Sequence, residues 1–172
     1  MNREDIEHEL IYKSSHDRFS CFYNLRHHLK GQDYWEVLSY AYKMSDNTYD
    51  QKLNIVETFL EKEPNSEMFM NSLERQKLAS LPDKIKIYRG MTVGEFKSGI
   101  FGISWTLDPK VAHFFAFDYG RNFTTNGEEK MIHEMIISKK NVFAYLASRY
   151  EEEIIYLNLK NAKELNDIDV LS

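Results

Sequence analysis

Cysteine, proline and glycine are scarce in this chain, which has one Cys, three Pro and seven Gly among its 172 residues. The single cysteine, Cys21, cannot form an internal disulfide, and this favours a reducing compartment. No apolar run approaches the length of a membrane span, and none follows the N-terminus as it would in a signal peptide. We therefore expect a cytoplasmic protein with no membrane partner; a protein exported by a leaderless route would have the same features.

An excess of positive charge is also lacking, because 27 acidic residues outnumber 22 basic ones and give a net charge of −5. Without clustered Lys and Arg, nucleic acid is not expected as the main partner, although one or two arginines suffice to hold a small anionic ligand. The six His residues show no metal-ligand spacing, so no metal site is expected. Neither a Walker-type phosphate loop nor a dinucleotide-binding fingerprint is present.

The rest of the composition is close to the average of a globular protein, with 42% apolar and 28% charged residues. This excludes a wholly disordered chain, a collagen-like fibre and a disulfide-framed miniprotein. Aromatic residues reach 14%, which favours a well-filled core with some rings left for a site. Gly31 stands alone, and the other six glycines lie between Gly90 and Gly127, so the irregular and functional part of the chain is expected there.

Residues 1–80 carry apolar residues at helical spacing and are predicted to form helices. Asp33 with Glu36 resembles a capping box and predicts the start of one of these helices. Ser66 predicts the cap of the last helix, which would run to about Leu78.

After Leu81-Pro82-Asp83 the apolar period becomes strand-like. Asp108 and Pro109 predict the start of a helix that ends near Gly120. Strands are predicted over residues 85–89, 99–106, 131–138, 142–146 and 153–159. The expected fold is α+β, with a helical N-terminal part in residues 1–80 and a mostly antiparallel sheet in residues 81–172, in one compact domain overall.

Three short segments combine small, polar and acidic residues at strand ends: Ile87-Tyr88-Arg89-Gly90, Gly102-Ile103-Ser104-Trp105-Thr106 and Glu151-Glu152-Glu153. Taken singly, they suit a surface-paired arginine, a half-buried strand with a satisfied hydroxyl, and a solvated turn. In this order they resemble the arginine–serine–glutamate class of mono-ADP-ribosyltransferases, of bacterial and phage type. Three elements of that class are matched over residues 85–159, by Arg89, by Ser104 with Thr106, and by Glu151 with Glu153.

The resemblance implies an ADP-ribosyltransferase core that uses NAD as co-substrate. It would cleave the nicotinamide–ribose bond and transfer ADP-ribose to a side chain of a protein target, as a toxin or effector does. Glu153 would stabilise the positive charge on the ribose in an oxocarbenium-like transition state. Arg89 would bind the diphosphate through its forked guanidinium, and Ser104 would hold the Glu153 carboxylate in position by a hydrogen bond.

The resemblance also implies the other contacts with NAD. Gly90, which has no side chain, would let the backbone approach the nicotinamide amide, and Thr106 belongs to the serine motif beside NAD. The loop Gly120–Glu128, with Arg121, would be the phosphate–nicotinamide loop. The candidates for stacking on nicotinamide are, in order of preference, Phe115, Phe114 and Phe123.

Glu151 bears on the acceptor. Residues i and i+2 of a strand share a face, so the carboxylates of Glu151 and Glu153 are expected in one cleft. A second carboxylate can attract and deprotonate a guanidinium, which favours arginine as the acceptor. Two alternatives stay open: an NAD glycohydrolase, in which water replaces the protein acceptor, and a catalytically silent domain of the same fold that binds or inhibits. The short interval from Arg89 to Ser104 is expected to leave little room for a helix.

Overall fold

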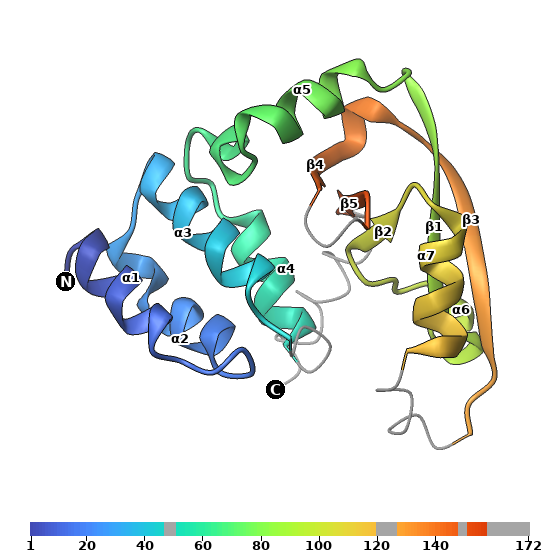
Figure 1. The fold of residues 1–172 in the computed structure, drawn as a ribbon, viewed down its shortest axis with the longest axis horizontal. Coiled ribbons are helices and arrows are strands. Elements are labelled where there is room, and N and C mark those ends of the chain that lie inside the picture. The colour runs from blue at the N-terminus through green and yellow to red at the C-terminus, as the bar shows by residue number, and fades with distance from the viewer. Residues whose placement is uncertain (47–50, 120–126, 148–150, 158–172) are drawn as a thin grey trace. The chain divides into compact units, whose positions relative to one another are not determined.

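The computed structural model describes residues 1–46, 51–119, 127–147 and 151–157. The chain divides into two compact units, Met1–Ser72 and Leu73–Ser172. Figure 1 shows helices through the first unit and the sheet with its helices in the second. The α+β class expected from the sequence is confirmed, with a helical N-terminal part followed by an antiparallel sheet.

The first unit consists of short helices. Their bounds are α1 Arg3–Ile11, α2 Arg18–Leu25, η1 Arg26–His28, α3 Gly31–Lys43, α4 Lys52–Leu60 and η2 Ser66–Phe69. Apolar side chains recur at helical spacing in the α-helices, so each of these presents a stripe to a common core, whereas η1 buries no residue. The largest fully buried side chains of this core are Trp35, Tyr34, Phe19, Phe22, Phe69, Ile6, Leu10 and Leu38.

The start of α3 corrects the predicted capping box. The helix begins at Gly31, so Asp33 lies inside its first turn. The carboxylates of Asp33 and Glu36 instead accept hydrogen bonds from Arg3 Nη1, over 2.7 Å and 2.6 Å. The Gly31 N–H donates to Glu63 Oε2 over 2.7 Å, so a residue distant in sequence caps α3. A local pattern cannot reveal such a cap.

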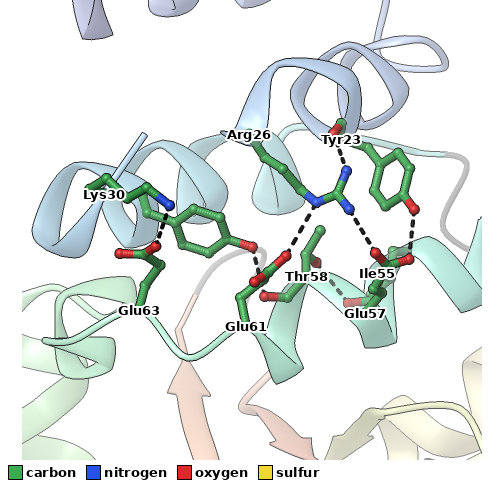
Figure 2. Close-up of polar contacts among 9 residues, drawn as sticks. Tyr23, Arg26, Lys30, Ile55, Glu57, Thr58, Glu61 and Glu63 are labelled. Atoms are coloured by element: carbon green, nitrogen blue, oxygen red, sulfur yellow. Dashed lines mark hydrogen bonds and ion pairs between the residues drawn. The ribbon is translucent and has the colours of Figure 1, made fainter. Parts of the chain in front are cut away.

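Arg26 joins η1 to α4 through a group of polar contacts (Figure 2). Its Nη2 donates to Glu57 Oε1 over 2.7 Å, and its Nη1 donates to the Tyr23 carbonyl oxygen over 2.6 Å. The guanidinium also lies 3.8 Å from the centre of the Tyr23 ring. Tyr23 completes the group by donating its hydroxyl to Glu57 Oε2 over 2.6 Å. These contacts link α2 and η1 to α4, and the Lys30–Glu63 ion pair links the residue before α3 to the segment after α4.

The helix predicted from Ser66 to about Leu78 is two elements, η2 and α5, which spans Ser72–Ser80. Met70, between them, has an extended backbone and a buried side chain. Its place in the core of the first unit ends the helix, while nearly all of α5 belongs to the second unit. Tertiary packing here overrides a continuous helical pattern.

The second unit is built on a five-stranded antiparallel sheet of order β3-β1-β2-β5-β4. The strands are β1 Lys84–Thr92, β2 Ser104–Thr106, β3 Lys130–Ser138, β4 Val142–Leu146 and β5 Glu153–Tyr156, and η5 Lys139–Asn141 links β3 to β4. The strands predicted over 131–138, 142–146 and the start of 153–159 are confirmed in type and position, whereas 158–159 lie outside the described residues.

The sheet has a narrow junction in its middle. β1 and β3 pair along their whole length, from Lys84↔Ser138 to Thr92↔Lys130. β1 and β2, by contrast, share the single pair Tyr88↔Thr106. The sheet is therefore a long β1–β3 ribbon joined at one residue pair to the group β2-β5-β4.

The segment between β1 and β2 differs from the prediction. Residues 99–106 were expected as one strand, but only Ser104–Thr106 is a strand, and the helix α6, Val93–Ser98, precedes it. The expectation that this interval leaves little room for a helix is therefore wrong. Thr92 caps α6 by accepting from the Glu95 N–H over 3.0 Å, and Gly99 ends it at φ 70°. One and a half turns fit because both ends are capped by residues of the segment itself.

The helix after Asp108 begins as predicted, since Asp108 Oδ1 accepts from the Lys110 N–H over 2.8 Å and Pro109 opens α7, Pro109–His113. It continues as a π-helical turn, η3, over Phe114–Asp118, closed by a bond from the Tyr119 N–H to the Phe114 carbonyl. α7 lies against β1, as Figure 1 shows. None of the helices described is long and apolar enough to cross a membrane.

Candidate active site

Ser104 and Glu153 form the closest polar pair of the predicted site. They lie on the neighbouring strands β2 and β5, where the register pairs Ser104 with Ile155 and Thr106 with Glu153. The Ser104 hydroxyl donates to Glu153 Oε1 over 2.5 Å, and Glu153 is only 9% exposed. The hydrogen bond expected from the sequence is therefore present. It gives a carboxylate at the start of a strand a fixed orientation in a largely dry environment.

Arg89 connects this pair to β1. Its Nη1 donates to the Ser104 carbonyl oxygen over 2.7 Å, and its Nε donates to Glu95 Oε1 over 2.8 Å. The side chains of Arg89 and Glu95 are both mostly buried, at 19% and 18% exposed. Arg89, Ser104 and Glu153 thus lie in one chain of hydrogen bonds that runs from β1 through β2 to β5.

Thr106 uses its hydroxyl within the protein. Its Oγ1 donates to the Glu151 carbonyl oxygen over 2.6 Å and accepts from the Asp108 N–H over 3.0 Å. The side chain is 5% exposed. Thr106 therefore fixes the backbone just before Glu153 to the start of α7, and a direct contact with NAD stays a prediction.

Glu151 does not stand in the relation to Glu153 that the sequence predicts. β5 begins at Glu153, so Glu151 lies before the strand. Glu152 between them has a left-handed backbone, at φ 41°. The alternation of a strand does not continue through such a residue, so the rule that i and i+2 share a face does not apply here. The strand-based reason for a shared face is therefore corrected, and the presence of both carboxylates in one cleft stays a prediction.

Gly90 owes its lack of a side chain to packing. A Cβ at this position would lie 2.7 Å from the Ala116 nitrogen and would also meet the Ala112 carbonyl oxygen. Both are backbone atoms of α7 and η3, which cannot yield as a flexible side chain does. The helix therefore occupies the side of Gly90 that a Cβ would take, and a contact of the Gly90 backbone with nicotinamide stays a prediction.

Phe115 belongs to a small aromatic cluster on η3. Its ring lies 5.5 Å from that of Phe114 and 5.3 Å from that of Tyr119. Phe114 is 46% exposed, whereas Phe115 is half-buried. Stacking of Phe115 on nicotinamide stays a prediction. Arg121, Phe123 and residues 120–126 of the expected ligand loop lie outside the described residues.

Comparison with known proteins gives no relative on which to rest an assignment. No protein-family model, curated protein or solved structure matches this chain. Function is therefore inferred from the residues of the site alone.

Three residues near the site were not singled out from the sequence: Glu74, Lys77 and Glu95. Glu74, on α5, is 2% exposed, and its Oε1 accepts from the Ala147 N–H at the end of β4 over 3.1 Å. Lys77 is one turn further along α5, and its Nζ lies 3.5 Å from Glu152 Oε1. α5 thus holds both ends of the connection from β4 to β5. No local pattern points to this, because the partners are far apart in the chain.

Glu95 has a pattern that could have identified it. Thr92 and Glu95 have the Thr-x-x-Glu spacing of a capping box, and Gly99 follows at the position of a helix stop. Those residues predict α6, and with it a carboxylate next to the strand that carries Arg89. The contact of Gly102 with the Arg89 side chain cannot be predicted in this way, because Arg89 lies on another strand, β1.

The chemistry open to this site is that of an oriented, buried carboxylate. Glu153 can stabilise a cation that forms beside it, and its low exposure strengthens that attraction. Within the part of the chain that the structure describes, no three His, Cys, Asp or Glu side chains gather as they would around a metal ion. Burial, with the neighbouring Glu152 carboxylate as a second cause, raises the pKa of Tyr145 on the adjoining strand.

Proposed function

We propose that this protein is an NAD-dependent mono-ADP-ribosyltransferase that acts on a protein side chain, with arginine as the preferred acceptor. The observation that carries the proposal is the 2.5 Å hydrogen bond from Ser104 to the buried carboxylate of Glu153. Arg89, the third residue of the motif, is bonded to the same serine through its backbone. Three residues that are distant in sequence are thus linked through Ser104.

Glu153 would act on the ribose. The reaction exchanges the bond between ribose and nicotinamide for a bond between ribose and an acceptor nitrogen, which loses a proton. Positive charge develops on the ribose when nicotinamide departs with the bonding electrons, as in glycoside cleavage. A carboxylate fixed by Ser104 needs no reorientation to stabilise that charge, and this is how a preorganised site lowers a barrier.

Glu153 and Ser104 fit the ribose end of NAD better than Arg89 fits its diphosphate. Two nitrogens of Arg89 are bonded to Glu95 and to the Ser104 carbonyl, and Glu95 already balances its charge. The N–H groups beyond these bonds are what Arg89 would offer to a phosphate oxygen. The proposal therefore gives Arg89 a shared role, in holding β2 and in contacting the diphosphate.

Hydrolysis of NAD is the second candidate. The left-handed backbone at Glu152 removes the strand-based reason for placing Glu151 beside Glu153. If no carboxylate activates a guanidinium here, water becomes the competing acceptor. The two reactions share the role of Glu153 and differ in the role of Glu151.

The first experiment measures release of nicotinamide from NAD by the purified protein, with a bacterial lysate present as a source of acceptors and biotin-labelled NAD as the tracer. Glu153→Ala should abolish both nicotinamide release and protein labelling. Glu134→Ala is the matched control, because Glu134 is an exposed glutamate on β3 whose carboxylate contacts Lys86. Release with no labelled protein would establish the glycohydrolase. Wild-type protein that releases no nicotinamide would overturn the proposal.

The second experiment tests the acceptor with agmatine, a small guanidine, in place of the lysate. If Glu151 activates the acceptor, Glu151→Ala should lose transfer to agmatine while keeping hydrolysis of NAD. Loss of both activities would assign Glu151 to the cleavage step instead. Mass spectrometry of a labelled lysate protein identifies the target and the modified side chain together.

A further inference from the structure

Glu95 receives two hydrogen bonds at one oxygen. Its Oε1 accepts from Arg89 Nε over 2.8 Å and from the Gly102 N–H over 2.9 Å. The cap that Thr92 provides to α6 fixes the helix on which Glu95 stands. A single carboxylate therefore ties the end of β1 to the segment that enters β2.

The Arg89 guanidinium packs directly against the backbone of Gly102. A Cβ on Gly102 would lie 2.7 Å from Arg89 Cζ and would meet the guanidinium nitrogens. The Gly102 carbonyl oxygen accepts from Trp105 Nε1 over 3.1 Å, and Trp105 is 2% exposed. Glu95 thus joins Arg89 and Gly102 into one hydrogen-bonded unit, the lock. The buried indole of Trp105 is bonded to the Gly102 carbonyl of this lock.

The lock controls where Ser104 lies. Arg89 Nη1 holds the Ser104 carbonyl, and Glu95 holds Arg89 and the N–H two residues before Ser104. β1 and β2 share one residue pair, so the sheet ladder alone gives this end of β2 little support. The side-chain hydrogen bonds hold this end of β2, which the short β1–β2 ladder does not.

We propose that Glu95 is a positioning residue of the Glu153 site, acting through Arg89 and Gly102 on Ser104. The inference rests on the proposed function for its kinetic part and on contacts within the second unit for its structural part. Glu95 has a second effect through its charge. By neutralising Arg89 in a mostly buried ion pair, it lowers the attraction of the guanidinium for a diphosphate. Glu95 therefore supports the turnover step while limiting affinity for NAD.

The test compares Glu95→Gln with Glu95→Ala. Glutamine keeps an oxygen that can accept both hydrogen bonds but carries no charge. Glu95→Gln should keep kcat for nicotinamide release within about threefold of wild type, because the geometry is retained, and should lower KM for NAD. Glu95→Ala should lower kcat about 10- to 100-fold, because a small misplacement of a catalytic pair is costly. Glu134→Gln, at the exposed glutamate of β3, should change neither constant.

A second measurement needs no activity. The chain has two tryptophans, and their indole N–H resonances can be followed in a nitrogen-15 spectrum. Glu95→Ala should shift the Trp105 resonance, because Trp105 donates to the Gly102 carbonyl. Trp35, which donates to the Glu63 carbonyl in the first unit, should keep its position and serves as the internal control. Glu95→Gln should leave both resonances close to wild type.

The two readouts separate the possible failures. If the wild type releases no nicotinamide, the proposed function fails, and with it the kinetic role of Glu95, whatever the Trp105 resonance does. If the wild type is active and Glu95→Ala keeps its kcat within twofold, the positioning role is overturned. A Trp105 resonance unmoved in Glu95→Ala overturns the lock itself. If Glu95→Ala does not fold, Glu95→Asp takes its place, since the shorter side chain cannot hold both donors in the same geometry.

Discussion

The hydroxyl of Ser104 lies 2.5 Å from the carboxylate of Glu153, although 49 residues separate the two in the chain. β2 and β5 run side by side to bring them together: Glu153 begins β5 opposite Thr106, two residues along β2 from Ser104. A serine at this point of β2 therefore has a defined partner. The predictions below test that pair, the packing behind it and the stability of the helical unit.

Ser104→Ala should lower kcat for nicotinamide release about 10- to 100-fold, because Glu153 loses the hydrogen bond that orients it. KM for NAD should stay within about threefold, since the hydroxyl acts on Glu153. Steady-state kinetics of nicotinamide release measure both constants. Ser80→Ala is the control, because the Ser80 hydroxyl donates to the Lys77 carbonyl oxygen in its own helix. An unchanged kcat in a folded Ser104→Ala protein would show that the bond has no catalytic role.

Gly90→Ala should destabilise the second unit by about 2–3 kcal/mol, because the new Cβ meets backbone of α7 and η3. Gly94→Ala is the matched control. At that position a Cβ finds its nearest atoms 3.6 Å and 3.9 Å away, and alanine favours the helix that contains it. It should change stability by about 1 kcal/mol or less, in the stabilising direction. Urea unfolding followed by tryptophan fluorescence and far-UV circular dichroism compares the two. Equal effects would contradict the packing role of Gly90.

The first unit should lose stability in acid. The Gly31 N–H and the Lys30 ammonium lower the pKa of Glu63, and hydrogen bonds from Gln32 and Arg3 lower the pKa of Glu36, each from an ordinary value of 4.5. A carboxyl whose pKa is lower in the folded state contributes stability above its unfolded value. That contribution is lost as the pH falls from about 4.5 through the folded values.

Glu63→Gln should cost about 1 kcal/mol at neutral pH and should flatten the dependence of thermal stability on pH below about 5. Thermal melts followed by far-UV circular dichroism at several pH values test this. Glu134→Gln should keep the wild-type slope, since its carboxylate pairs with an exposed lysine in the other unit. A Glu63→Gln protein with the full acid sensitivity of wild type would rule out Glu63 as a source of the effect.

Features set by neighbouring residues were predictable from the sequence. Asp108 and Pro109 start α7 where expected, because both act on the backbone within one turn. The strands after residue 130 were found from their period and lie where predicted. The hydrogen bond between Ser104 and Glu153 could be predicted from the order of the three motifs along the chain, although no local pattern links the two residues.

Features set by distant residues were not predictable. The cap of α3 comes from Glu63, and the support of the β4–β5 connection comes from Glu74. The extension of the strand back to Glu151 was wrongly inferred, because a left-handed residue at Glu152 cannot be read from a run of three glutamates. α6 was missed although Thr92 and Glu95 are spaced as a helix cap, because the interval from Arg89 to Ser104 was expected to leave little room for a helix.

The single residue pair between β1 and β2 has a consequence for how the second unit opens. Amide protons of the β1–β3 ribbon and those of β2, β5 and β4 should exchange with solvent as two separate groups, since a sheet parts first where its ladder is shortest. Such an opening carries Ser104 and Glu153 away together and leaves Arg89 behind on the other group. A difference in amide protection between the two groups of strands would then report whether the site is closed.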